Sequence, residues 1–120
     1  MLLNKSFFVV SDNSGAKYVQ CIKIFSNKKI ANIGDIITVV VKKCDMTAKK
    51  IKKGSVCKAL IIRSKRGYKR SNGLYIKFDQ NAVILLNKQN IPFAKRLKGP
   101  ILRETCIKHN FIGSISRYII

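Results

Sequence analysis

The sequence predicts an all-β fold, either a small barrel or an orthogonal sandwich, followed by a short helical tail. Three observations support this. Apolar segments are short and rich in β-branched residues, turn signals separate them, and the links leave no room for helices in the first three quarters of the chain. Closure of the sheet would also remove the exposed edges of such apolar strands. The expected strands are Phe7–Val10, Lys17–Ile24, Ile36–Val41, Ser55–Arg63, Leu74–Phe78 and Val83–Leu86.

Two of these strands are apolar on both faces, which places them inside the fold. Ile36–Val41 follows the turn residues Gly34 and Asp35 and consists almost entirely of β-branched residues. The run Ala59–Ile62 has the same two-sided apolar character. Strands of this kind are typical of central positions that are covered on both sides.

A basic β-hairpin is expected between residues 63 and 78. Cations crowd the segment from Arg63 to Arg70, and no acid interrupts them. The turn signal Ser71–Gly73 follows directly, and Leu74–Phe78 then alternates like a strand. The pattern therefore predicts positive charge at the tip of a hairpin with apolar arms.

The tail has helical rather than strand periodicity. Pro100 follows Gly99 and suits the first turn of a helix, and Asn110 is a stop signal. The expected apolar stripe contains Ile101, Leu102, Thr105, Cys106 and His109, and a last short helix would use Phe111, Ile112, Ile115 and Ile119. We expect a single domain over residues 1–120, with the helical tail at about 100–120.

The chain carries a formal net charge of +20, from 25 Lys and Arg against 5 Asp and Glu. Repulsion on this scale favours a polyanionic partner, and nucleic acid is the leading class. A membrane surface is second, because neither a basic amphipathic helix nor an apolar stretch of about 20 residues is present. Cations concentrate between residues 42 and 70, opposed only by Asp45: Lys42, Lys43, Lys49, Lys50, Lys52, Lys53, Lys58, Arg63, Lys65, Arg66, Lys69 and Arg70. A solvated charged face normally mixes signs, so phosphate binding is the preferred interpretation.

The residues argue against an enzyme and against a metal centre. The five acids are scattered, and no pair has the spacing of an acid–base site. His109 is the single histidine, and Cys106 alone cannot complete a zinc site with it. The four cysteines contain no C-x-x-C pair, which is typical of free thiols in a reducing compartment. We therefore expect no catalytic residues, no metal and no cofactor.

Composition indicates an AT-rich genome, because Ile, Lys and Asn supply 46 of the 120 residues. Such a bias suggests an organelle or an AT-rich bacterium. The start, Met1–Ser6, interrupts any signal-peptide core and shows no Arg- and Ser-rich presequence. We expect an organelle-encoded protein of the mitochondrion, with the plastid and the bacterial cytoplasm as alternatives.

Several segments together resemble the universal ribosomal protein fourteen of the large subunit, the L-fourteen family. They occur in the family's order and at nearly its spacing across essentially the whole chain. The segments are Asp12–Ala16, Cys21–Lys23, Gly34–Ile37, Lys52–Gly54, Lys58–Arg63, Asn72–Gly73, Phe78–Ala82, Leu85–Asn87, Gly99–Pro100 and Arg103–Glu104. One departure falls in the hairpin turn, where Ser71–Gly73 replaces the usual Pro-Asp-Gly and removes a negative charge.

The resemblance implies a closed five-stranded β-barrel with a basic hairpin and short C-terminal helices, bound to large-subunit rRNA. It also implies an inter-subunit bridge to small-subunit rRNA, with neighbouring proteins of the L-three and L-nineteen types. The RNA-facing residues that it implies are Asn13, Ser14, Lys17, Lys52, Lys53, Arg63, Lys65, Arg66, Lys69 and Arg70. Lys95 and Arg96 fall where the family exposes a surface to the other subunit and to a ribosome-silencing factor.

Two other functions stay open at this point. A free single-strand RNA-binding or regulatory barrel would use exposed aromatics, and Tyr68 and Tyr75 are the candidates near the hairpin. A small ribonuclease would need an acid–base pair, for which only His109 offers a starting point. The loop at Asp12–Ala16 is itself open, since it suits close approach to RNA and suits a plain turn equally well.

Overall fold

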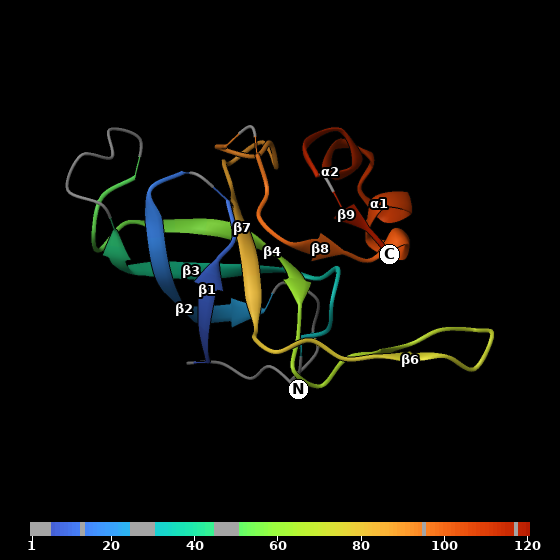
Figure 1. Cartoon of the computed structure of the whole chain (residues 1–120). Helices are drawn as coiled ribbons and strands as arrows, with labels where there is room; N and C mark the ends of the chain where they lie inside the picture. Colours follow the sequence, from blue (N-terminus) through green and yellow to red (C-terminus); the bar gives the residue numbers. More distant parts are fainter. Residues whose placement is uncertain (1–5, 13, 25–30, 45–50, 95, 117) are drawn as a thin grey trace.

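The computed structural model describes residues 6–12, 14–24, 31–44, 51–94, 96–116 and 118–120, and in these ranges strands predominate over two short helices (Figure 1). The elements are β1 (Phe7–Val10), β2 (Ala16–Ile24), β3 (Ile36–Cys44), β4 (Val56–Arg63), β5 (Tyr68–Lys69), β6 (Tyr75–Ile76), β7 (Ala82–Leu86), β8 (Pro100–Ile101), α1 (Arg103–Lys108), α2 (Asn110–Ile115) and β9 (Tyr118–Ile119).

Five of the strands form a closed barrel in the order β1-β2-β3-β4-β7. Successive neighbours pair antiparallel, and the parallel pairing of β1 with β7 closes the cylinder through Val9↔Ala82 and Val10↔Val83. The expected fold class is confirmed, and of the two architectures left open by the strand pattern the barrel is the correct one.

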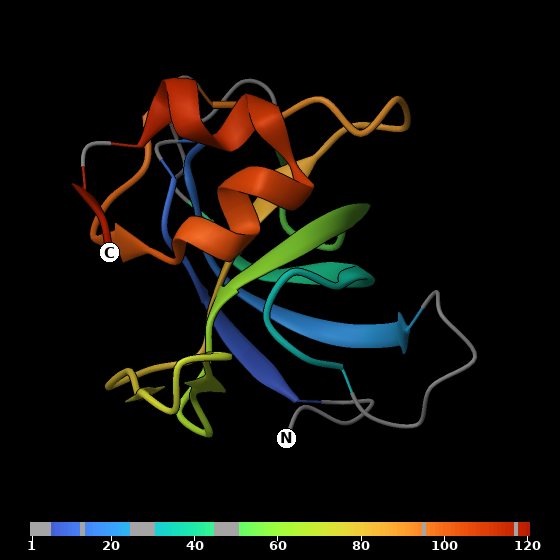
Figure 2. The same cartoon turned by 90° about the vertical axis from the view of Figure 1, so that its right-hand side faces the viewer.

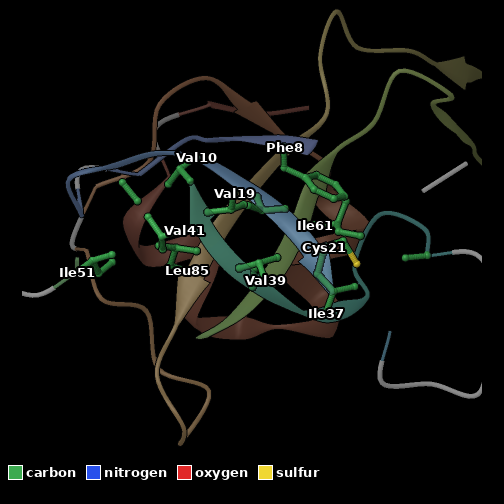
Figure 3. Packing of buried hydrophobic residues seen from close by; sticks show 14 residues of the cluster. Phe8, Val10, Val19, Cys21, Ile37, Val39, Val41, Ile51, Ile61 and Leu85 are labelled. Atoms are coloured by element: carbon green, nitrogen blue, oxygen red, sulfur yellow. The ribbon is translucent and has the colours of Figure 1, made fainter. Parts of the chain in front are cut away.

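The barrel interior is filled by the inward-facing residues of each strand (Figure 3). On β3 these are Ile37, Val39 and Val41, which alternate with partly exposed neighbours. Phe8 from β1 and Ile61 from β4 add to the same cluster. Burying such a side chain stabilises the fold by about 1.5–3 kcal/mol relative to leaving it in water.

The outer face of β4 and β7 is also buried, because the C-terminal elements cover it. Leu60 and Ile62 of β4 and Ile84 of β7 pack with Ile101 and Ile112 in a second apolar cluster. Figure 2 shows both helices lying over this side of the barrel. The predicted two-sided burial of Ala59–Ile62 is confirmed, since all four side chains are fully buried.

The β5–β6 hairpin stands outside the barrel as a separate two-stranded sheet, with Tyr68↔Ile76 and Lys69↔Tyr75 as its pairs. It projects away from the barrel at the lower right of Figure 1. The predicted hairpin is confirmed. The predicted strand Leu74–Phe78 is shorter than expected, because only Tyr75–Ile76 pairs with the other arm.

The tail begins differently from the prediction. Pro100–Ile101 is not the first turn of a helix but strand β8, paired in parallel with Tyr118–Ile119 of β9. Helix α1 therefore starts at Arg103, and Ile119 lies in a strand instead of the last helix. The two helices themselves are confirmed. His109 lies between them, where its Nε2 is 3.1 Å from the carbonyl oxygen of Gly34.

Candidate nucleic-acid interface

The basic hairpin, residues 63–78, carries three exposed cations on its first arm: Lys65, Arg66 and Lys69. The tip is a tight turn in which the Arg70 N–H donates to the Leu74 carbonyl at 2.8 Å. The Leu74 N–H donates in turn to the Asn72 side-chain oxygen at 3.1 Å. Lys77 is exposed on the second arm, so the positive charge lies along both arms and not at the tip, where it was predicted, and the polar turn forms the end of the hairpin.

Close packing around Gly67 fixes the path of this arm. Gly67 has φ of +86°, and a Cβ there would overlap the Ile76 carbonyl oxygen on the opposite arm. The Tyr75 hydroxyl also donates to the Arg66 carbonyl. These contacts hold the backbone of the exposed cations in one conformation before any ligand binds.

Arg70 fastens the hairpin to the C-terminal elements. Its Nε lies 2.8 Å from Glu104 Oε1 of α1, and its Nη2 donates to the Ile120 carbonyl. The Nε–Oε1 contact is an ion pair. The side chain is 20% exposed. Arg70 was predicted to face RNA, and its partners give it a positioning role as well.

Arg63 was predicted to contact RNA, and this prediction is wrong, because Arg63 is only 6% exposed. Nη1 donates to the carbonyls of Lys98 at 2.8 Å and Pro100 at 3.2 Å, and Nη2 donates to Ser11 Oγ. Burial lowers the pKa of the guanidinium. Gly99, with φ of +83°, packs so closely against Nη1 that a side chain there would overlap it. Arg63 therefore clamps the segment 98–100 to the barrel.

The turn between β1 and β2 is tied down internally. Asp12 Oδ1 accepts the Ser14 N–H at 3.1 Å and its hydroxyl at 2.5 Å, while Oδ2 accepts the Leu85 N–H at 3.0 Å. Ser14 was predicted to face RNA. Its side chain is buried, and its hydroxyl is used within the turn instead. Lys17 is exposed, and Asn13 lies outside the described residues.

The remaining predicted cations that the structure describes are exposed. Lys42 on β3 and Lys52 and Lys53 before β4 are exposed. Arg96 is exposed as well, as is Lys98, which the sequence reasoning did not select although it adjoins Gly99–Pro100. Lys49, Lys50 and Lys95 lie outside the described residues.

Three of the acids, Asp12, Asp35 and Glu104, have partners within the fold. Asp35 Oδ2 accepts the Asn32 N–H at 2.8 Å, and its Oδ1 lies 3.9 Å from Lys108 Nζ. All four cysteines are free, and burial, followed by the charge of Asp12, raises the pKa of Cys57 to about 11. Across the described ranges, no three His, Cys, Asp or Glu side chains are placed to hold a metal ion.

Fold and surface together define the class: a small basic β-barrel protein with a projecting cationic hairpin. The chain belongs to the ribosomal protein L14p/L23e family, whose family model matches residues 1–120. This is a family of ribosomal proteins and not of enzymes. The large ribosomal subunit protein uL14 of Carsonella ruddii (strain PV) is 52% identical over 106 residues, which cover 87% of this chain and 86% of that protein. None of the described helices is both long enough and apolar enough to cross a membrane.

Proposed function

We propose that this chain is a structural constituent of the large ribosomal subunit and binds its rRNA through the hairpin cations Lys65, Arg66 and Lys69. Family membership supports the ribosomal part of this proposal, and the uL14 relative supports the large subunit. The single observation that carries the RNA contact is the exposure of these three cations on a hairpin anchored by Arg70 and packed around Gly67.

The mechanism is electrostatic. Cations held on a preformed hairpin offset the repulsion between phosphates where RNA segments converge, and no reaction is catalysed. Because the hairpin conformation is fixed by internal contacts, little ordering entropy is lost on binding. Lys17, Lys42, Lys52 and Lys53 are exposed outside the hairpin and offer further positive charge to phosphates.

The finer assembly contacts follow from the family resemblance. We propose a bridge to small-subunit rRNA, with neighbours of the L-three and L-nineteen types. Arg96, which is exposed beside the clamped segment 98–100, supports a surface for the other subunit or for a ribosome-silencing factor. Lys95 belongs to the same proposed surface and lies outside the described residues.

The compartment is proposed from composition and from the relative. The excess of Ile, Lys and Asn supports a mitochondrial ribosome, whereas the Carsonella protein is bacterial and supports an AT-rich bacterium equally. Fractionation of the source cells into organelles and cytosol, followed by detection of this chain with the large subunit, separates the two.

Sucrose-gradient sedimentation of a cell lysate tests the main proposal. We expect the chain to sediment with the large subunit and to remain there at moderate salt, because many phosphate contacts act together. Release at modest salt, or presence only in the soluble top fractions, would contradict a structural role. That outcome would favour a free single-strand RNA-binding module instead.

A further inference from the structure

Two successive β-bulges, one on each strand, interrupt the pairing of β2 with β3. Between the pairs Ala16↔Cys44 and Tyr18↔Lys43, β2 gains one residue, Lys17. Between Tyr18↔Lys43 and Val19↔Val41, β3 gains one residue, Lys42. The second bulge restores the register that the first one shifts. Bulges redirect side chains and often occur beside functional sites, so their effect on this surface is informative.

The bulges place adjacent residues on the same side of each strand. Regular alternation would send one residue of each adjacent pair into the barrel. Here Lys17 and Tyr18 are both exposed, and so are Lys42 and Lys43. We call these four residues the bulge site. The bulges thereby expose three cations and one tyrosine on two paired strands.

The bulge site combines a ring with charge at short range. The Tyr18 side chain is 47% exposed, and Lys43 Nζ lies 6.0 Å from the centre of its ring. In such a cation–π contact the cation lies over one face of the ring, which leaves the other face for a base. Tyrosine supplies a flat apolar surface at small cost in side-chain entropy, which suits stacking on a base.

A hollow of about 390 Å³ opens beside Tyr18 and is lined by Val9, Asp12, Lys17, Tyr18 and Lys98, among others. The Asp12 carboxylate accepts three hydrogen bonds from Ser14 and Leu85, so its charge is directed into the fold. Lys17 and Lys98 are exposed at the rim. The hollow therefore combines apolar side chains, one aromatic ring and cations, the chemistry that accommodates a base and its phosphates.

We propose that the bulge site binds one unpaired nucleotide of an RNA strand. Its base stacks on Tyr18, and its flanking phosphates lie against Lys17, Lys43 and Lys98. This proposal rests on the proposed rRNA binding and adds a second contact to it. The bulge site lies on β2 and β3, away from the basic hairpin in the sequence. A nucleic acid is favoured over a polyanion without bases, because only bases offer a flat group to the exposed ring, and the choice of RNA follows from the proposed function.

Binding of short RNA by the full chain tests this site. The probes are hexauridylate and hexaadenylate, with inorganic polyphosphate of matched charge as a probe without bases. Tyr18→Ala should weaken oligonucleotide binding about 5- to 100-fold, the range for loss of one stacked base, and Tyr18→Phe should retain it. Polyphosphate binding should be unchanged in both. Tyr118→Ala, at a tyrosine outside the hollow that is 61% exposed, is the control.

A second readout keeps the test separate from the proposed function. Large subunits assembled with 4-thiouridine-labelled rRNA should form a photo-crosslink at Tyr18 in the wild-type chain. If Tyr18→Ala and Tyr118→Ala bind RNA with equal affinity and no crosslink forms at Tyr18, nucleotide binding at the bulge site is refuted. The proposed rRNA binding by the hairpin is not affected by that result. If the chain binds no large-subunit rRNA at all, the proposed function fails, whatever the oligonucleotides do.

Discussion

The barrel and the β5–β6 hairpin acquire their geometry by different means. In the barrel, alternating apolar residues such as Val39 and Ile61 are fully buried, and their packing determines the strand positions. In the hairpin most side chains are exposed, and polar contacts of Arg70 and Tyr75 with close packing at Gly67 hold the backbone in place. A projecting element that lacks a core must use some of its own charged residues as fasteners.

This difference divides the cations of the hairpin into two groups. Arg63 and Arg70 have partners within the protein, whereas Lys65, Arg66 and Lys69 present their charge to solvent. Arg is suited to the first role because its planar guanidinium donates in several directions from one position. Substitutions in the two regions should therefore change different quantities.

The largest loss of stability is expected in the barrel. Ile61→Ala removes a fully buried side chain and should lower the free energy of unfolding by about 2–5 kcal/mol, through lost burial and a residual cavity. Urea titration measures this. Ile22→Ala, at a 46% exposed position on β2, should stay within about 0.5 kcal/mol of wild type. Similar losses in both variants would refute the role given to the core.

Removal of the Arg63 clamp should cost nearly as much. Arg63→Met leaves the carbonyls of Lys98 and Pro100 without their donor, and we expect a loss of about 2–4 kcal/mol in urea. The matched variant Arg66→Met alters an exposed arginine and should leave unfolding unchanged while weakening RNA binding. Weakened RNA binding by Arg63→Met with unchanged stability would restore the original prediction of Arg63 as an RNA contact.

Strain at Gly67 should affect the hairpin alone. Gly67→Ala forces a Cβ against the Ile76 carbonyl at a positive φ, at a local cost of about 1–3 kcal/mol. Hydrogen exchange should then accelerate at the β5–β6 amides and stay slow in the barrel. Gly113→Ala in α2 adds a methyl group with open space around it and serves as the control. Acceleration throughout the barrel would contradict the separation of the two regions.

A smaller change is expected from the ion pair at the hairpin tip. Glu104→Gln removes a partly exposed partner of Arg70, at a cost of about 0.2–1 kcal/mol. NMR relaxation should report greater motion at residues 69–75. Asp79→Asn, an exposed acid beyond the hairpin, is the control for loss of one negative charge. If the hairpin of Glu104→Gln is as rigid as that of the wild type, contacts other than the ion pair hold it in place.

The least pronounced effect concerns pH and the Cys57 thiol, whose pKa is raised to about 11 by burial and by Asp12. Between pH 9 and 11 the thiol ionises in the unfolded chain but stays protonated in the folded one. The folded state then binds more protons, so stability falls as the pH rises through this window. Cys57→Ala should flatten that decline in urea titrations, which separates it from lysine titration. Parallel curves for both proteins would exclude the thiol as a contributor.

Much of the fold was predictable because burial leaves a strong pattern in sequence. The runs Ile36–Val41 and Ala59–Ile62 are apolar on both faces, and both are barrel strands, although only Ala59–Ile62 is buried on both sides and the outer face of Ile36–Val41 is partly exposed. The choice between barrel and sandwich needed the family resemblance. Pro100–Ile101 was mistaken for a helix start because its partner Tyr118–Ile119 lies far along the chain, and local periodicity does not record such pairing.

The candidate site was predictable only in part, because a sequence does not distinguish an exposed cation from a buried one. Arg63 and Lys65 looked alike in the basic run, yet only Lys65 is exposed. Ser14 was chosen for its hydroxyl, which the structure uses within the turn. The bulges that expose Lys17 beside Tyr18 depend on the β2–β3 register, so no local pattern could have revealed them.

The central claim is that the exposed hairpin cations bind rRNA phosphates, and the salt dependence of binding tests it most directly. Affinity for large-subunit rRNA should be measured between low and moderate salt for wild type and for the triple variant Lys65→Gln, Arg66→Gln, Lys69→Gln. A control triple variant alters the exposed cations Lys23, Lys88 and Arg103. We predict that the hairpin variant loses about 2–3 from the slope of log affinity against log salt, with unchanged stability. An unchanged slope, or an equal loss in the control, would contradict the account.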